Sequence, residues 1–176
     1  MVLKPQDVLV VLKLVASGGL NFTFAQLGQQ IGMSASESHQ AFHRARRAGL
    51  VQPVFNQPVK GAVAELLIHG LKYVFPVHPG GRTRGMLTGV AAPPLSASFN
   101  VGTADRDVFV WPDPEGSHAG LEIRPLCRSV PVAARQDARL YEWLVVADVL
   151  RGAGRARERE LAEEWVRGRL ENNASR

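Results

Sequence analysis

The sequence lacks most of the features that mark secreted, membrane-spanning and disulfide-stabilised proteins. It contains one cysteine, Cys127, so no disulfide can form within the chain, which fits a reducing compartment. No run approaches the roughly 18 uninterrupted apolar residues of a transmembrane helix, and Lys13 interrupts the apolar stretch that a signal peptide would need. These absences predict a cytoplasmic protein that makes no contact with a membrane.

Motifs for catalysis are also scarce. The segment "HPGGRTRG", residues 78–85, is not followed by the Lys and Ser or Thr of a P-loop, and it is more typical of a tight turn between strands than of a phosphate site. No Ser-His-Asp order or nucleophile elbow is present. Carboxylates that could bind divalent ions in a nuclease, but that are more typical of solvated turns, are Asp105, Asp107, Asp113 and Glu115. We therefore expect no enzymatic activity and no cofactor.

One pair of residues has the spacing of metal ligands. His39 and His43 are four residues apart, which places both imidazoles on one helix face. A metal site needs a third and a fourth ligand, and the HExxH pattern of zinc proteases is absent. We therefore expect no bound metal.

What the sequence has in excess is positive charge. Its 176 residues carry a formal net charge of +5, with 45% hydrophobic and 21% charged residues. This composition supports a packed core, in one medium domain or two small ones, and favours a polyanionic partner. Arginine greatly outnumbers lysine, and its planar fork suits phosphates and guanine edges, although a GC-rich genome also raises arginine content.

Three helices are predicted in the first 50 residues. The first covers residues 4–16, the second begins near Thr23 and the third covers residues 34–48. Each of the last two has a capping box, with Thr23 three residues before a Gln and Ser34 three residues before a Glu. The glycine at position 32 makes the turn between them. This order predicts a helix-turn-helix unit.

The third helix is a candidate recognition helix for the DNA major groove. In this motif the first half of the second helix of the pair faces base edges. Gln side chains can pair with adenine, Glu can accept from cytosine, and the arginines one turn further on can hold phosphates. The predicted DNA-binding residues are Ser34, Ser36, Glu37, His39, Gln40, His43, Arg44 and Arg47. The alternative is an ordinary amphipathic helix of a protein-binding domain.

The stretch "FAQLGQQIGMSASESHQAFHRARRAGLV" resembles the helix-turn-helix of winged-helix bacterial regulators such as the MarR and GntR families. The shared features are the "LGxxIGMS" entry, the small-residue cap and the "RRAGLV" exit into a strand. This resemblance implies a sequence-specific regulator of transcription that binds double-stranded DNA. Residues 52–60 contain two prolines and predict at most a very short ribbon where those families have a wing.

The rest of the chain predicts an α+β fold that is mainly α. A fourth helix from Asn56 completes a DNA-binding domain at residues 1–72. Residues 73–176 form the second domain, a small irregular β region followed by a C-terminal αα-hairpin of helices at 137–152 and 155–170. The predicted strands are Tyr73–Val77, Met86–Val90, Val108–Trp111 and Leu121–Ile123.

Two kinds of protein partner follow. The helices at 4–16 and 137–170 have more apolar surface than a small headpiece needs, which predicts a homodimer. The segments "LKYVFPVHPGGRTRGMLTGVAAPP", "VWPDPEG" and "GRARERELAEE" resemble the C-terminal part of small bacterial proteins that accompany nucleotidyltransferases, and AbiEi-type antitoxins have a similar architecture. The alternative function is therefore an antitoxin or adaptor that holds a partner toxin or nucleotidyltransferase through residues 73–170.

Overall fold

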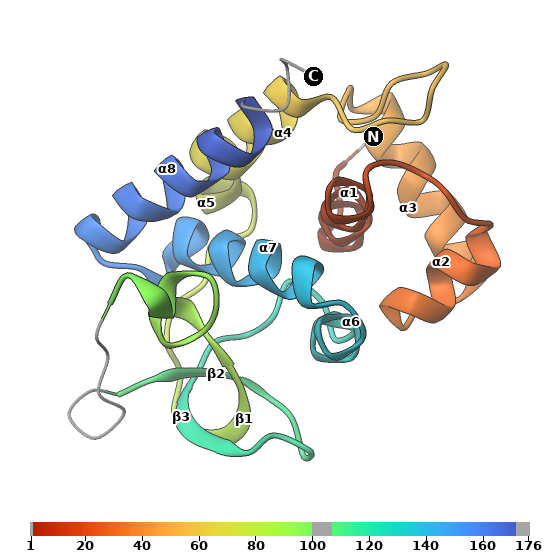
Figure 1. Ribbon diagram of the computed structural model, residues 1–176. Coiled ribbons are helices and arrows are strands. Elements are labelled where there is room, and N and C mark those ends of the chain that lie inside the picture. The colour runs from red at the N-terminus through yellow and green to blue at the C-terminus, as the bar shows by residue number, and fades with distance from the viewer. Residues whose placement is uncertain (1, 100–106, 172–176) are drawn as a thin grey trace. The chain divides into compact units, whose positions relative to one another are not determined.

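The computed structural model describes residues 2–99 and 107–171 as a mainly helical α+β fold with a small three-stranded mixed sheet in its middle part (Figure 1). The helices are α1 (Pro5–Ser17), α2 (Phe24–Ile31), α3 (Ala35–Arg47), α4 (Lys60–Glu65), α5 (Leu71–Val74), α6 (Val130–Gln136), α7 (Ala138–Asp148) and α8 (Ala156–Glu171), and the strands are β1 (Arg82–Thr88), β2 (Phe109–Pro112) and β3 (His118–Glu122). Within these ranges no helix is both long enough and apolar enough to cross a membrane.

The chain divides into two compact units, and each unit draws on two stretches of sequence. Unit 1 consists of Met1–Val63 and Leu126–Leu144, and unit 2 of Ala64–Pro125 and Val145–Arg176. The units are defined by packing, whereas the predicted domains 1–72 and 73–176 are defined by function. The functional division at residue 72 stays a prediction.

Helix α1 is the most buried helix of unit 1. Its residues from Asp7 to Leu14 are all buried, and α1 packs against both α2 and α3. Lys13 lies within this buried stretch, and its ammonium group is 2.7 Å from the carboxylate of Asp137 at the start of α7. A buried lysine needs such a partner because an unpaired charge is costly away from water.

The predicted start of α2 at Thr23 and of α3 at Ser34 is confirmed, including both capping boxes. Between them Gly32 ends α2 in the left-handed conformation. Gly28, one turn earlier, lies so close to the turn before α3 that an added Cβ would be 2.5 Å from the carbonyl oxygen of Met33. A residue without a side chain at position 28 therefore allows α2 and the start of α3 to approach closely.

The fourth helix begins later than predicted, at Lys60 and not at Asn56. Residues 50–59 form a very short antiparallel ribbon instead, with one isolated bridge between Val51 and Pro58. The backbone groups of this stretch are therefore used across the ribbon and are not available for a helical turn. The expected short ribbon is present, and it contains the positions that were assigned to the helix start.

The sheet of unit 2 closes on itself. Strand β1 pairs antiparallel with both β2 and β3, and β2 and β3 pair with each other in parallel. Gly85 is the residue of β1 that pairs with both, opposite Pro112 and His118. A Cβ at Gly85 would be 1.8 Å from the carbonyl oxygen of Trp111, so this crossing point requires glycine.

Two sequence predictions for residues 73–134 are wrong. The predicted strand Tyr73–Val77 is not a strand, because α5 continues the hydrogen-bonded helix that begins at Lys60, through the π-helical turn Leu66–Gly70, as far as Val74. Helix α6 was missed, although Pro131 sits in its first turn, where proline is favoured. The helices predicted at 137–152 and 155–170 correspond to α7 and α8.

A buried ionic cluster connects the sheet of unit 2 to its helices. The carboxylate of Asp148 accepts hydrogen bonds from the hydroxyl of Thr88 at 2.8 Å, the indole N–H of Trp111 at 2.5 Å and Nε of Arg151 at 2.8 Å. The Arg151 guanidinium also donates to the carbonyl oxygens of Phe75 and residue 124. Asp148 and Arg151 are at most 5% exposed, so each charge depends on the other.

We expect Asp148→Asn to destabilise the protein strongly. The substitution keeps the shape of the side chain but leaves the buried Arg151 guanidinium without its counter-charge, which typically costs about 3 kcal/mol or more. Thr88→Val, which removes one neutral donor, should cost only about 1 kcal/mol. Urea unfolding followed by circular dichroism and tryptophan fluorescence measures both, and a loss for Asp148→Asn no larger than that for Thr88→Val would contradict this view of the cluster.

Candidate nucleic-acid interface

Helix α3 has one face packed into unit 1 and one face free. Its buried residues are Ser38, Ala41, Phe42 and Ala45. The predicted DNA-binding residues that are exposed are Ser34, Ser36, Glu37, His39, Gln40 and Arg47. Within the described chain, Ser36, Gln40 and Arg47 have no hydrogen bond or ion pair to another side chain, so their polar groups are open to a ligand.

The start of α3 is fixed by its capping box. The Ser34 hydroxyl accepts from the backbone N–H of Glu37 at 3.1 Å, and Oε2 of Glu37 accepts from the backbone N–H of Ser34 at 2.9 Å. These bonds from Ser34 lower the pKa of Glu37, and Arg128 nearby lowers it further. Glu37 therefore serves mainly as a helix cap through Oε2. Its other carboxylate oxygen, Oε1, is the one that could accept a hydrogen bond from a DNA base.

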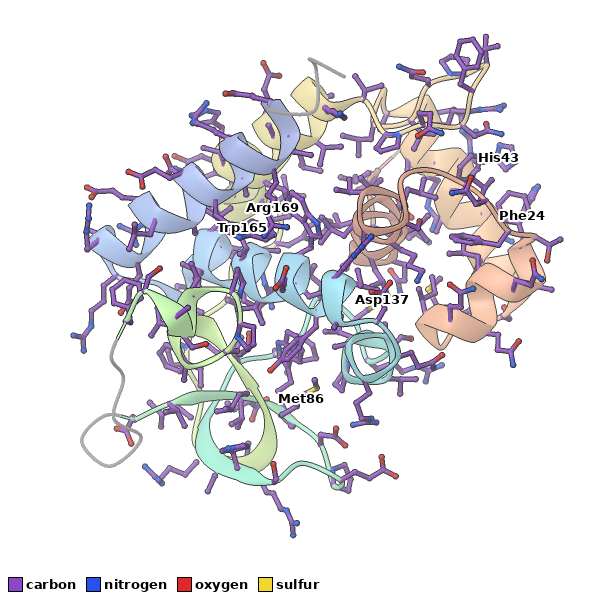
Figure 2. All side chains as sticks on the ribbon, in the orientation of Figure 1. Phe24, His43, Met86, Asp137, Trp165 and Arg169 are labelled. Atoms are coloured by element: carbon purple, nitrogen blue, oxygen red, sulfur yellow. The ribbon has the colours of Figure 1, made fainter. Side chains whose placement is uncertain are left out.

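His39 and His43 form an aromatic cluster with Phe24 of α2. The two imidazole centroids are 4.3 Å apart, and the Phe24 ring is 4.8 Å from that of His39. Figure 2 shows the Phe24 and His43 side chains next to each other, from α2 and α3. Partial burial lowers the pKa of His43, and the neighbouring His39, Arg46 and Arg47 lower it further. A neutral His43 can both donate and accept a hydrogen bond.

This histidine pair lacks further metal ligands. In the described ranges no three His, Cys, Asp or Glu side chains are grouped so as to hold a metal ion. The predicted acidic residues do not converge either. Asp107 pairs with Arg82 and Asp113 caps the turn at Glu115, while Asp105 lies outside the described residues.

Arg44 differs from its prediction. It was expected to hold a phosphate, but its guanidinium donates from Nε and Nη2 to the carboxylate of Asp7 at 2.7–3.0 Å. The Asp7 side chain is fully buried and that of Arg44 is 15% exposed. Arg44 thus ties α3 to the first turn of α1, and the cations of this helix that remain for a polyanion are Arg46 and Arg47.

From the middle of α3 onward the chain contains no acidic residue over a long stretch. Between Glu37 and Glu65 the sequence contains no Asp or Glu, but it contains Arg46, Arg47 and Lys60 in addition to Arg44. The carboxylate of Glu37 is held at the helix start, and that of Asp7 is neutralised. The C-terminal half of α3 therefore presents net positive charge, while the ribbon 50–59 that follows it contains no charged residue.

No protein-family model, no curated protein and no solved structure matches this chain. The arrangement of side chains is therefore the basis for assigning a function.

Sequence reasoning missed the support that α6 gives to the turn before α3. The hydroxyl of Ser129 donates to the carbonyl oxygen of Gly32 at 3.0 Å, and the side chain of Val132 lies against the same glycine. Arg128, in the same segment, is close enough to influence Glu37. These contacts join residues nearly one hundred positions apart, and no local pattern in the sequence indicates them. By contrast, the Phe24 contact could have been expected from its place one helix before the histidines.

The segment 78–85 does not form a free anion-binding loop. Its second half belongs to β1, where Arg82 pairs with Asp107 and Arg84 donates to the carbonyl oxygen of Gly116 at 2.5 Å. The two arginines of this segment, Arg82 and Arg84, are therefore both engaged within unit 2.

Arg44→Gln and Arg47→Gln, one helical turn apart, should differ in their effect on stability. Arg44→Gln leaves the buried Asp7 carboxylate without its counter-charge and should lower the free energy of unfolding by about 3 kcal/mol. Arg47→Gln removes an exposed side chain and should change it by less than about 0.5 kcal/mol. Urea denaturation of both variants gives the comparison, and equal losses would show that the ion pair does not hold α3.

Glu37→Gln should reduce stability in a pH-dependent way. Because the pKa of Glu37 is lowered in the folded protein, its charge stabilises the fold above the ordinary glutamate pKa, and this contribution disappears as the pH falls through the lowered value. Gln keeps the hydrogen bond to Ser34 but loses the favourable charge at the helix start. Melting temperatures of the two proteins should therefore differ at pH 7 and converge in acid. A constant difference down to acidic pH would argue against the charge effect.

Proposed function

We propose that this protein is a sequence-specific double-stranded DNA-binding protein and regulator of transcription, with α3 as the helix that enters the major groove. The observation that carries the proposal is the division of α3 into a buried face, which Arg44 at its edge ties to Asp7 of α1, and a free polar face with Ser36 and Gln40. In this proposal α2 and α3 form a helix-turn-helix, the ribbon 50–59 takes the place of a wing, and α7 and α8 form the C-terminal αα-hairpin.

The free face has the chemistry that base reading needs. Gln40 can donate and accept at once, as bidentate pairing with adenine requires, and neutral imidazoles and hydroxyls adapt to several bases. Ser36, Gln40 and His43 succeed each other at spacings of three to four residues, so they follow one stripe along the helix. Anchoring matters here, because a reading helix must present these groups at fixed positions.

Phosphate contact in this proposal falls to Arg47 and Arg46 and not to Arg44. Arg47 is exposed and without a partner in the described chain, whereas Arg44 is held by Asp7. The acid-free stretch from residue 38 to residue 64 keeps the surroundings favourable for a polyanion. The formal net charge of +5 acts in the same direction over longer distances.

The predicted homodimer remains part of the proposal, but its reason is now the symmetry of a palindromic DNA site and no longer an unburied apolar surface. The apolar residues of α1 that suggested a dimer are buried within the single chain. Binding to a palindromic site with two copies of α3 would still need a second protomer. Light scattering of the free protein and of its DNA complex measures the number of copies.

A second candidate function is an adaptor that holds a partner enzyme, such as a toxin or nucleotidyltransferase. It is supported by the large exposed side chains at the end of α5, where Tyr73 is 78% and Val74 50% exposed. Co-purification of the product of the neighbouring gene, abolished by Tyr73→Ser but not by Gln40→Ala, would favour this candidate.

The DNA-binding proposal predicts different effects for a residue that contacts bases and a residue that contacts phosphates. DNA fragments bound in a genome-wide pull-down supply the probe for fluorescence anisotropy. Gln40→Ala should weaken binding to the preferred DNA sequence by about 1–3 kcal/mol, because a base contact is lost, and should leave binding to unrelated DNA unchanged. Arg47→Gln should weaken binding to all DNA sequences alike, because a phosphate contact is lost. The plot of the logarithm of the association constant against the logarithm of the salt concentration should become shallower by roughly one.

Arg139→Gln, an exposed arginine of unit 1 on α7, is the matched control and should bind like the wild type. If Gln40→Ala and Arg47→Gln also bind like the wild type, or if the wild type binds no DNA, the proposal fails.

A further inference from the structure

Unit 2 contains a cavity of about 440 Å³ beside its small sheet. Its apolar wall includes Val90 after β1, Phe109 at the start of β2 and Leu121 in β3. Residues 152–155 and Glu158 in the first turn of α8 also line the cavity. Cavities of this size and mixed lining are typical of small-molecule sites, and this one accommodates a compound with a single aromatic ring.

The charged groups at this cavity differ in their exposure. Glu158 is only 6% exposed, and its Oε2 accepts from the backbone N–H of Arg155 at 2.7 Å. The side chain of Arg155 is exposed, and Asp107 is exposed and paired with Arg82. Glu158 is therefore the charged side chain that lines the cavity from a buried position among the described residues.

We infer that this cavity binds a small primary amine with an apolar, aromatic body, and that the Glu158 carboxylate accepts hydrogen bonds from its ammonium group. A charge-assisted hydrogen bond is strong where water is excluded, whereas an exposed arginine such as Arg155 contributes little. The ring of Phe109 adds an attractive surface for a cation and for a second ring.

An anionic ligand is disfavoured at the same place. The start of α8 would by itself attract a negative charge, but the carboxylate of Glu158 already lies there and satisfies the N–H of Arg155. A carboxylate ligand would be brought close to this buried negative charge and would have to rely on the exposed Arg155. The inference is independent of DNA binding, which involves unit 1.

The cavity also has an internal reporter. Thr88 lines it, and the Thr88 hydroxyl donates to the Asp148 oxygen that accepts the indole N–H of Trp111. An occupant of the cavity should therefore shift the NMR signal of the Trp111 indole N–H as well as the backbone amide signals of Ala153 and Gly154.

The test titrates the full chain with three probes of similar size, namely 2-phenylethylamine, 2-phenylethanol and 3-phenylpropionate, and follows these NMR signals. The amine should bind with saturation and at least tenfold more tightly than the alcohol and the carboxylate. This comparison requires no protein variant. Equal binding of amine and alcohol, or no saturable shift with the amine, would overturn the inference. Tighter binding of the carboxylate, lost in Arg155→Gln, would reverse the assigned charge and also overturn it.

The variant Glu158→Gln tests whether the Glu158 carboxylate causes the preference for the amine. Gln can still accept the N–H of Arg155, so the helix start is preserved, but amine affinity should fall at least tenfold towards that of the alcohol. Glu160→Gln, an exposed position on the same helix that pairs with Arg157, is the matched control and should bind the amine like the wild type. An unchanged affinity in Glu158→Gln contradicts the inference, while anisotropy with DNA separately tests the function proposed for unit 1.

Discussion

The buried carboxylate of Asp7 is the constraint on which the candidate interface depends. A fully buried charge in the first turn of α1 has to be neutralised, and Arg44 does so from α3 with hydrogen bonds from two nitrogens. Arg44 lies at the border between the two faces of α3, with Ala41 and Ala45 buried on one side of it and Gln40 and Arg47 exposed on the other. The ion pair at this border thus ties α3 to α1 next to the side chains that α3 can offer to a partner.

The turn before α3 is held from a distant part of the sequence. Ser129 donates to the carbonyl oxygen of Gly32, and Asp137 neutralises the buried Lys13 of α1. Both partners lie beyond residue 125, so the three N-terminal helices complete their hydrogen bonding only when the chain returns to them. A segment that ended at residue 72 would lack both partners, so the Lys13 ammonium would have no carboxylate beside it and the Gly32 carbonyl oxygen would lose its donor.

How far the sequence predicts this structure depends on the range of the interactions. Thr23 and Ser34 were identified as caps because a capping box lies within four residues, and both are caps in the structure. Arg44 was taken for a phosphate ligand because its partner is 37 positions away and nothing local distinguishes it from Arg47. Tyr73 was assigned to a strand by its aromatic side chain, but the helix through residues 66–70 continues past it. Local chemistry therefore predicted where helices begin, and long-range pairing decided which polar residues remain free.

Among the described residues, each unit has an arginine–carboxylate pair largely removed from water, Asp7 with Arg44 and Asp148 with Arg151. Such pairs often add little net stability compared with well-packed apolar residues, because both charges must leave water. What they contribute is direction, since each N–H and each oxygen requires a partner in a particular place. In unit 2 the Asp148 carboxylate holds Thr88 and Trp111 in place through hydrogen bonds. In unit 1 Asp7 holds α3 in one rotation through its bonds with Arg44. We expect an apolar core of the same volume to tolerate small rotations of α3, each of which would move Gln40 relative to a base edge, so in the proposed function the polar pair favours a single geometry.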